Sequence, residues 1–196
     1  EQPFQTDICT AYQMPTYNHI LRDKLCWGKD KALYLFAKQK VDVSSFDIIF
    51  CSSYYYFPLY AAHLLAKEFN IPLAIDLRDI AEQWGDTPYF TRQITPFHKL
   101  HYWIGKLYER RQLYMRNRIL QTANIVTSIS PWHQQLLAHY NQNTHLIYNG
   151  YDADIFVPQN TINKYFYITY LGKLYSTQLR DPRLLFEALK QLIAAH

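Results

Sequence analysis

The stretch that decides the fold is Phe46–Leu77, FDIIFCSSYYYFPLYAAHLLAKEFNIPLAIDL. It opens with the short, mostly apolar run Phe46–Cys51, which is typical of a strand buried on both faces of a sheet. A helix is predicted next, because Pro58 favours a first turn, apolar residues then recur at helical spacing, and Asn70 favours an end. Leu73–Leu77 reads as a second buried strand. A strand, a helix and a strand within about thirty residues predict a crossover unit and a parallel sheet.

The alternation of helices and strands continues along the chain. The further elements predicted from periodicity and from start signals are helices over Asp30–Gln39, over Leu100–Ala123, from Pro131 and from Asp181-Pro182, and strands over Thr6–Tyr12, Ile125–Ile129, His145–Tyr148 and Phe166–Leu171. The fold class is therefore α/β, with a doubly wound, mostly parallel, Rossmann-like sheet. The last strand and helix would begin a second domain of the same kind.

The stretch LIYNGYDADIF, Leu146–Phe156, is expected to divide the chain. A buried strand leads into Asn149-Gly150, a dipeptide that readily adopts positive φ, and Asp152 can then bond its own backbone. On these turn residues alone an ordinary surface loop is an open alternative. The predicted organisation is residues 1–157 as one Rossmann-like domain that lacks its first strand, and 158–196 as a linker and the beginning of a second domain.

Composition places the chain among globular proteins. With 196 residues, 49% of them hydrophobic, it can form a sizeable core, and 5 Gly and 9 Pro exclude a low-complexity chain. The 18 tyrosines suit a binding cleft, since a Tyr ring packs while its hydroxyl meets a polar ligand. The net charge of +4 permits an anionic partner without demanding one. The cysteines, Cys9, Cys26 and Cys51, show no C-x-x-C spacing, which favours a reducing compartment.

No stretch reaches the roughly 18 to 20 uninterrupted apolar residues that a membrane-spanning helix needs. The start of the chain also lacks the basic leader and apolar core of an export signal. We therefore expect a cytoplasmic protein, with the inner face of the cytoplasmic membrane as a further place of action. Because the chain starts at Glu1 and stops at His196 inside a predicted helix, we also expect it to be part of a longer protein.

In a sheet of this kind, ligands bind in the loops that follow the carboxyl ends of the strands. The first such loop begins with Ser52, Ser53 and Tyr54, whose hydroxyls and ring suit a sugar or a nucleobase. Tyrosines packed on neighbouring surface loops would explain the same residues equally well.

The second loop carries three charged residues at the end of a buried strand. Asp76 and Arg78 point to one side of the strand, because side chains alternate, and Asp79 follows them. Buried charges destabilise a fold unless they are paired or used. The three residues therefore form either a network that fixes the loop or a ligand site, and a doubly wound fold places its ligands here.

The third loop follows the predicted strand Phe166–Leu171. Gly172 lets the backbone approach a ligand, Lys173 supplies a cation, and the N-terminus of the next helix favours anions. The phosphate-binding motifs G-x-x-x-x-G-K and G-x-G-x-x-G are both absent from the sequence. The hypothesis of a phosphate site therefore rests on a single Gly-Lys pair.

The segment Arg92–Arg118 interleaves basic and aromatic residues. On a helix, Lys99, Lys106 and Arg110 fall along one stripe, with Arg111 beside it. A solvated helix face explains this pattern, and so does a surface that meets anionic lipid headgroups. The chain shows no nucleic-acid-binding motif, so no nucleic-acid partner is expected. The histidines of the segment lack a third ligand at useful spacing, so no metal site is expected.

Taken in order, the motifs FDIIFCSSYYYFPLYAAHLLAKEFNIPLAIDLRD, TANIVTSISPWHQQLL, LIYNGYDADIF and FYITYLGKLYSTQLRDPRLLFEAL resemble those of the group 1 glycosyltransferases (sugar-transferase family 4), which have the GT-B fold. The resemblance runs from about Phe46 to the end of the chain. In that family two Rossmann-like domains face each other across a cleft. The first binds mainly the acceptor and the second binds the nucleotide-sugar. The resemblance thus implies that residues 1–157 form the acceptor-side domain and that 158–196 begin the donor domain.

The resemblance also implies roles for single residues. Arg78 stands where many members have a histidine beside the donor sugar, and Asp79 follows it, so these two are the candidate catalytic residues. The other implied positions are Gly172, Lys173 and Arg180 for the donor diphosphate, Ser52, Ser53, Tyr54 and Asp76 for the acceptor-side loops, and Asn149, Gly150 and Asp152 for the interdomain hinge.

The family reaction transfers a sugar with retained configuration and without a metal, to a saccharide or lipid-linked acceptor, as in polysaccharide or glycolipid synthesis. It would need stabilisation of charge on the leaving diphosphate more than a protein nucleophile. No cofactor is therefore expected beside the nucleotide-sugar substrate. The family's paired glutamates, separated by seven residues, do not occur in the sequence. We therefore expect residues 1–196 alone to transfer no sugar.

Two other classes of function stay open at this point. A non-catalytic module could hold a glycan through its tyrosine-rich loop. A membrane-surface or interaction domain could act through Arg92–Arg118, which is compatible with an enzyme that uses a lipid-linked acceptor.

Overall fold

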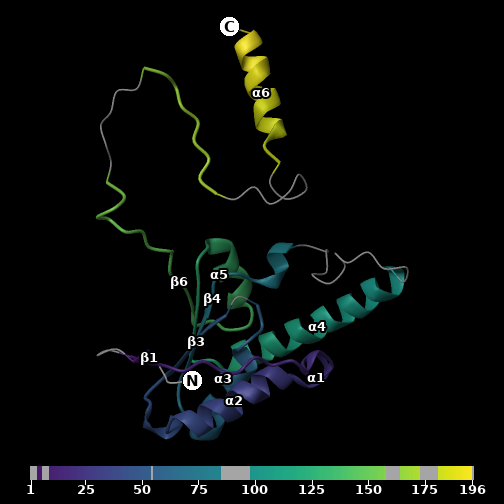
Figure 1. Cartoon of the computed structure of the whole chain (residues 1–196), viewed down its shortest axis with the longest axis vertical. Coiled ribbons are helices and arrows are strands. Elements are labelled where there is room, and N and C mark those ends of the chain that lie inside the picture. The colour runs from purple at the N-terminus through teal and green to yellow at the C-terminus, as the bar shows by residue number, and fades with distance from the viewer. Residues whose placement is uncertain are drawn as a thin grey trace. The chain divides into compact units, whose positions relative to one another are not determined.

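The structure is a computed structural model of the chain, and it describes residues 4–5, 9–53, 55–84, 98–157, 164–172 and 181–195 (Figure 1). Among the residues singled out from the sequence, Tyr54, Lys173 and Arg180 lie outside these ranges. Of Lys99 only the backbone, within a helix, is described.

In chain order the elements are β1 (Phe4–Gln5), β2 (Thr10–Ala11), α1 (Ile20–Cys26), α2 (Gly28–Lys40), the 3-10 turn η1 (Val43–Ser45), β3 (Ile49–Ser53), α3 (Leu59–Phe69), β4 (Leu73–Leu77), the 3-10 turn η2 (Ala81–Trp84), α4 (His98–Thr122), β5 (Ile125–Ser128), α5 (Pro131–Ala138), β6 (Thr144–Leu146) and α6 (Arg183–Ala194). From β3 to β6 helices and strands alternate as the sequence predicts, whereas helix α1 was not predicted.

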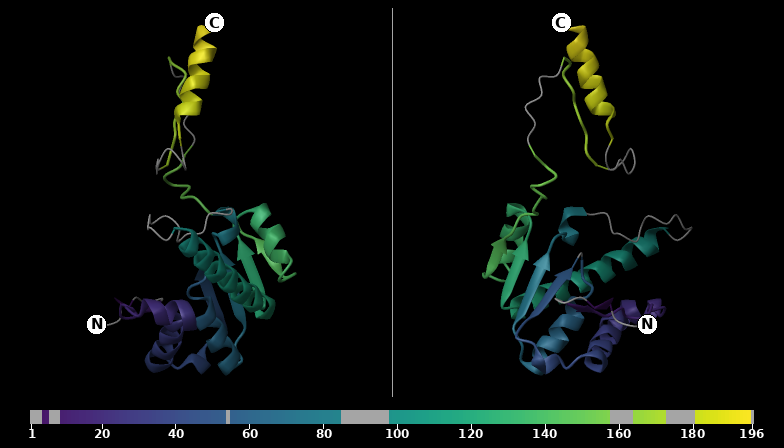
Figure 2. Two further views of the ribbon diagram at one scale, coloured as in Figure 1. Left: turned by 90° about the vertical axis from the view of Figure 1, so that its right-hand side faces the viewer. Right: turned by 60° about the vertical axis from the view of Figure 1, so that its left-hand side comes forward.

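Strands β3 to β6 form one parallel sheet in the order β3-β4-β5-β6, and they lie side by side in Figure 2. The register pairs Ser52 with Asp76 and Asp76 with Thr127, so the carboxyl ends of neighbouring strands are level. A separate antiparallel pair joins β1 to β2. The predicted α/β class, the parallel sheet and its Rossmann-like character are confirmed.

One face of the sheet carries the hydrophobic core. The strands contribute alternate residues to the core, which are Cys51, Leu73, Ile75, Leu77 and Val126. Helices α3, α4 and α5 contribute the apolar residues that pack against them, which are Leu59, Ala62, Ile119, Leu120 and Leu137. Helices α3, α4 and α5 therefore cover the same face. This packing is the main source of stability, because burial of a large apolar side chain contributes about 1.5 to 3 kcal/mol.

The prediction that Phe46–Cys51 is a strand buried on both faces is wrong. The strand is Ile49–Ser53, and the side chain of Phe50 is 64% exposed. The reason lies in the sheet order, since β3 is the first strand of the described sheet and pairs only with β4. Central β4, by contrast, is buried along its whole length, as predicted.

Helix α3 is capped by a residue from another helix. Asp30, on α2, is 5% exposed, and its Oδ1 accepts hydrogen bonds from the backbone N–H groups of Tyr60 and Ala61, both at 3.1 Å. These two donors belong to the first turn of α3, where Pro58 precedes the helix and makes no side-chain cap. Burial raises the pKa of Asp30 from 3.8 to about 6, although the two backbone hydrogen bonds lower it.

A raised pKa in the folded state means that Asp30 stabilises the fold in its protonated form. That contribution is present below pH 4 and is lost as the pH rises through about 6. Asp30→Asn keeps the Oδ1 acceptor and stays neutral. We expect the variant to be more stable than the wild type at pH 7.5, by about 1 to 3 kcal/mol. The gain should vanish near pH 4. Urea unfolding at both pH values measures it, with the exposed Asp47→Asn as the control. An equal difference at the two pH values would contradict the assignment.

The chain divides into two compact units, Glu1–Gly150 and Tyr151–His196, a little before the boundary predicted after residue 157. In the first unit, neither Asn149 nor Gly150 has a positive φ, so the expected tight turn does not form. The second unit does show the predicted self-bonding of Asp152, whose Oδ1 accepts from the backbone N–H of Asp154 at 3.0 Å. The roles of the units as acceptor and donor domains stay predictions.

Within the second unit, the helix predicted from Asp181-Pro182 is α6, and Asp181 Oδ1 accepts from the backbone N–H of Arg183 at 3.0 Å. The strand predicted over Phe166–Leu171 does not form. Both end residues of that stretch are 90% exposed, and no neighbouring strand pairs with it among the described residues. A strand is stable only when its backbone groups are hydrogen-bonded to a partner, so apolar residues alone do not make one here.

Candidate functional site

The carboxyl edge of the sheet holds a hydrogen-bonded network centred on Asp76. This side chain is 7% exposed, at the end of β4. Its Oδ1 accepts from Thr127 Oγ1 on β5 at 2.8 Å, and its Oδ2 accepts from Ser52 Oγ on β3 at 3.2 Å. The same Oδ2 accepts from Arg78 Nε at 2.9 Å. Three hydroxyl and guanidinium donors thus satisfy a carboxylate that burial would otherwise destabilise.

Arg78 extends this network to the end of β6. Its guanidinium donates to Asn149 Oδ1 as well as to Asp76, while 49% of the side chain stays exposed. Arg78 and Asn149, which are 71 positions apart in the sequence, therefore meet at one edge of the sheet. The guanidinium is held on two sides and still open to solvent. Such a group can bind an anion or the hydroxyls of a sugar without first being ordered.

The other predicted residues of this edge have different partners. Ser53 is 4% exposed, and its hydroxyl donates to the carbonyl of Phe57 at 2.9 Å, which holds the loop before α3. Asp79 Oδ1 accepts from Gln83 Nε2 at 2.8 Å. Sequence reasoning missed Thr127. The signal that could have found it is the register of β4 against β5, which puts it opposite Asp76.

A buried ion pair lies just beyond Asp79. Arg116, on α4, has a side chain 1% exposed, and it binds Glu82 on η2 with both guanidinium ends, at 2.6 and 2.7 Å. Burial by itself would raise the pKa of Glu82, but the hydrogen bonds and charge of Arg116 outweigh burial and lower it. The pair ties the segment after β4 to α4. It was not predicted, because Arg116 belongs to the segment Arg92–Arg118 that was expected to face solvent or lipid.

His133, in the first turn of α5, lies in the field of the same acidic residues. It is 6% exposed, and its Nδ1 has no hydrogen-bond partner in the described part of the chain. Burial lowers the pKa of His133, and the charges of Asp79 and Glu82 oppose that shift. Ser128, fully buried at the end of β5, also has an unpartnered hydroxyl there. Both groups were missed because neither forms a motif with its sequence neighbours.

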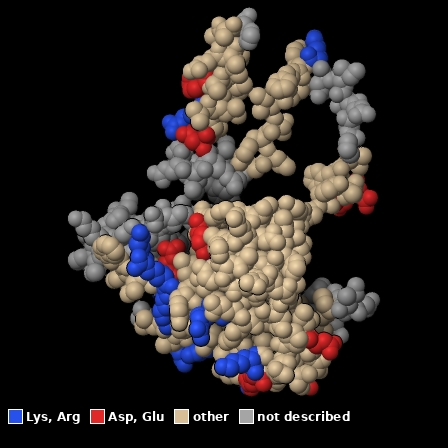
Figure 3. Space-filling view, turned by 180° about the vertical axis from the view of Figure 1, so that it is seen from behind, with Lys and Arg blue, Asp and Glu red and all other residues tan. Residues whose placement is uncertain are grey.

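The basic segment is divided by the structure. Arg111 stacks on the Trp27 ring at 3.7 Å and donates to the carbonyls of Lys24 and Leu25, at 2.8 and 2.6 Å, so it binds the end of α1. Arg111 therefore has a structural role at α1, and its membrane-facing role stays a prediction. Arg110 is exposed and Lys106 is partly exposed on the same helix. Figure 3 shows Lys and Arg gathered in a stripe on the side of the molecule where α4 runs.

Neither a candidate membrane span nor a cluster of metal ligands occurs among the residues described. No helix there is long and apolar enough to cross a membrane. No three side chains of His, Cys, Asp or Glu within the described ranges group as metal ligands. Gly172, the predicted phosphate-binding glycine, belongs to the second unit.

The Glu82–Arg116 pair yields a stability prediction. Arg116→Met leaves the Glu82 carboxylate, whose side chain is 24% exposed, without its cation, so it should lower the free energy of unfolding by about 1 to 3 kcal/mol. The double variant Arg116→Met with Glu82→Leu should lose less than the sum of the single variants. Urea unfolding of the four proteins completes the cycle. Additive losses would show that the two side chains do not interact in the folded chain.

A family comparison covers the part of the chain that contains the Asp76 network. Residues 7–155 match the model of the family described as Glycosyltransferase Family 4, and this span contains the whole network from Ser52 to Asn149. No curated protein matches the chain.

Proposed function

Because this chain belongs to glycosyltransferase family 4, we propose that residues 1–157 are the acceptor-side domain of a GT-B enzyme and that 158–196 begin its donor domain. The enzyme would transfer a sugar from a nucleotide-sugar to a saccharide or a lipid-linked acceptor, with retained configuration, in polysaccharide or glycolipid synthesis. It would act in the cytoplasm, at or near the inner face of the membrane.

The observation that carries this proposal is the guanidinium of Arg78, held by Asp76 and Asn149 at the carboxyl edge of the sheet. Ligands bind at this edge in parallel α/β folds. An oriented cation here can stabilise negative charge on a leaving diphosphate, which is the charge that sugar transfer develops. Asp79 lies next in the chain and is held by Gln83, so it can fix the geometry of the same loop.

On the donor side, the proposal relies on three residues of the segment that precedes α6 in the sequence. Gly172, Lys173 and Arg180 would hold the diphosphate with backbone N–H groups and two cations, as the matching motif suggests. With cations supplied by side chains, the reaction as proposed needs no metal. Residues 1–196 contain no pair of glutamates separated by seven residues, so we propose that this chain alone completes no transfer.

The test uses the chain with a panel of oligosaccharides and a panel of nucleotide-sugars. We expect saturation-transfer NMR to detect binding of at least one oligosaccharide, and Arg78→Ala to weaken it by about tenfold or more, since hydrogen bonds to a charged group contribute about 1.5 to 3 kcal/mol. The matched control is Arg22→Ala, an exposed arginine on α1. No turnover of any nucleotide-sugar is expected.

Two results would count against this function. Oligosaccharide binding that Arg78→Ala leaves unchanged would remove the carboxyl edge from the acceptor site. Turnover by residues 1–196 would refute the proposed inactivity of the chain alone. A third result would favour the non-catalytic glycan-binding module. In that case glycans bind, no nucleotide-sugar binds, and Lys173→Ala leaves glycan binding unchanged.

A second candidate function rests on the exposed part of α4. Its side chains include Trp103, Ile104 and Leu107, which are 65%, 55% and 70% exposed, and Arg110 is exposed close by. Aromatic and aliphatic side chains beside a cation are what peripheral proteins use at an anionic membrane surface. Membrane contact would also bring the enzyme to a lipid-linked acceptor.

Liposome sedimentation tests the membrane surface. We expect the chain to bind vesicles of anionic phospholipid at low salt, and binding to fall several-fold as salt is raised. Trp103→Ser with Arg110→Glu should abolish it, while Lys31→Glu on α2 should not. Equal binding of the double variant and the wild type would show that α4 is not the contact surface.

A further inference from the structure

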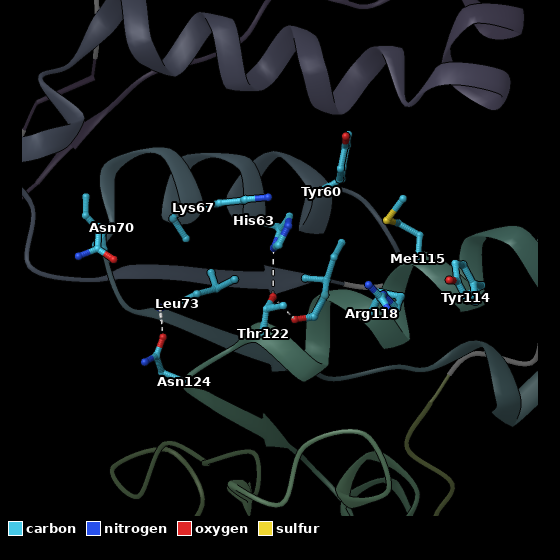
Figure 4. Close-up of a pocket in the computed structure, with 13 residues that line it drawn as sticks. Tyr60, His63, Lys67, Asn70, Leu73, Tyr114, Met115, Arg118, Thr122 and Asn124 are labelled. Carbon is cyan, nitrogen blue, oxygen red and sulfur yellow. Dashed lines mark hydrogen bonds between the residues drawn. The ribbon is translucent and has the colours of Figure 1, made fainter.

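A groove on the first unit reaches the amino ends of β4 and β5. It runs between α3 and the second half of α4, and it has a volume of about 700 Å³, within the range of sites for small molecules (Figure 4). Leu73 and Asn124, which line it, stand at the amino ends of β4 and β5. An occupant of this groove would therefore not touch the Arg78 network, which lies at the carboxyl ends of the same strands.

The floor of the groove is apolar. Leu73 and Ile119 are each 2% exposed, so they belong to the core and present only an edge to the opening. Met115 and Ala66 are partly buried beside them. The ring of Tyr60 forms part of the wall and stacks on the imidazole of His63 at 6.5 Å between centroids. This surface can accept a flat or aliphatic body.

The charge of the lining has one sign. Lys67 comes from α3 and Arg118 from α4, the two helices that form the walls, and none of the described residues that line the groove is Asp or Glu. Both are exposed, and no ion pair joins either to an acidic residue among the described residues. Lys38 on α2 shows the contrast, because Glu68 binds it at 2.6 Å. Among the described residues no acidic side chain therefore competes with a ligand for these two cations.

A hydrogen-bond chain fixes the imidazole between these cations. Thr122 Oγ1 donates to the carbonyl of Ile119 at 2.8 Å, so it meets His63 Nδ1 as an acceptor, at 3.1 Å (Figure 4). The proton of a neutral His63 therefore lies on Nδ1, and Nε2 is left to a ligand. Burial and the charge of Lys67 lower the pKa of His63. A bound anion would offset both effects.

We propose that this groove binds a small organic anion: the anionic group contacts Lys67 and Arg118, and an apolar body lies on Leu73, Ile119 and Met115. The charge of the lining selects the anion, and the buried floor selects a ligand with more than an ionic group. The proposed occupant is a soluble molecule other than the sugar donor or the acceptor, since no residue of the Arg78 network lines the groove.

The probe is 1-naphthyl phosphate, which joins a phosphate to a flat apolar body. Inorganic phosphate and 1-naphthol each supply one half of it. Binding is followed by the imidazole NMR signals of the chain, with the His63 signal assigned by His63→Asn, and by calorimetry. We expect 1-naphthyl phosphate to shift the His63 signal and to bind at least about tenfold more tightly than either half.

Charge-reversal variants identify the cations. Lys67→Glu and Arg118→Glu should each weaken binding of 1-naphthyl phosphate by about tenfold, and binding of 1-naphthol should be unchanged. Lys67→Gln and Arg118→Gln, milder changes at exposed positions, serve if a reversal disturbs folding. The matched control is Lys31→Glu, an exposed lysine on α2. Arg78→Ala should also leave this binding unchanged, which separates the groove from the proposed acceptor site.

Three outcomes would overturn the proposal. The groove is not an anion site if the two reversals leave the affinity unchanged, or if the His63 signal does not shift at saturating 1-naphthyl phosphate. It is not selective for the joined ligand if inorganic phosphate binds as tightly. A decyl phosphate arm distinguishes the source of the anion. Tighter binding of this ligand than of 1-naphthyl phosphate would replace the soluble aromatic anion with a lipid-like one.

Discussion

The arrangement of side chains at the carboxyl edge of the sheet depends on the hydrogen bonds that the carboxylate of Asp76 accepts. This carboxylate is almost fully buried at the end of the central strand β4, and hydroxyls from the strands on both sides donate to it. A buried charge of this kind is tolerated because its donors come from three elements at once. The same carboxylate also orients Arg78, so the interaction that stabilises the edge of the sheet is the one that presents a cation to a ligand.

Two arginines of α4 stabilise the fold, a role that the basic composition of the helix does not reveal. Arg116 is buried against Glu82, and Arg111 stacks on Trp27 and caps the last carbonyls of α1. Arginine suits both positions because its planar fork binds several acceptors while its face lies on a ring. The basic character of α4 therefore consists of two parts. Some cations hold the fold together, and others, such as Arg110 and Arg118, remain at the surface.

Two separate surfaces of the first unit are suited to anions. One is the carboxyl edge, where Arg78 is held in a polar network, and the other is the groove between α3 and α4, where the cations flank an apolar floor. The polar edge fits a ligand rich in hydroxyls and phosphates. The groove fits a ligand with an apolar body.

The sequence alone determined the features that depend on near neighbours in the chain. Helical and strand periodicity located β4, α3 and α5 to within a residue or two, and the alternation along β4 put Asp76 and Arg78 on one side. The motif order resembled sugar-transferase family 4, and the family match over residues 7–155 agrees with that family. Such features follow from local dihedral preferences and from spacing, which a sequence states directly.

Only the tertiary structure decided which distant residues meet. Asp30 caps a helix about thirty positions away in the sequence. Thr127 donates to Asp76 because the strand register puts the two residues side by side, and Arg116 is buried where it pairs with Glu82. The predicted burial of β3 and the predicted strand over Phe166–Leu171 failed for the same physical reason. Whether an apolar run is buried or paired depends on the elements that cover it, and those elements are brought there by packing and register rather than by the run itself.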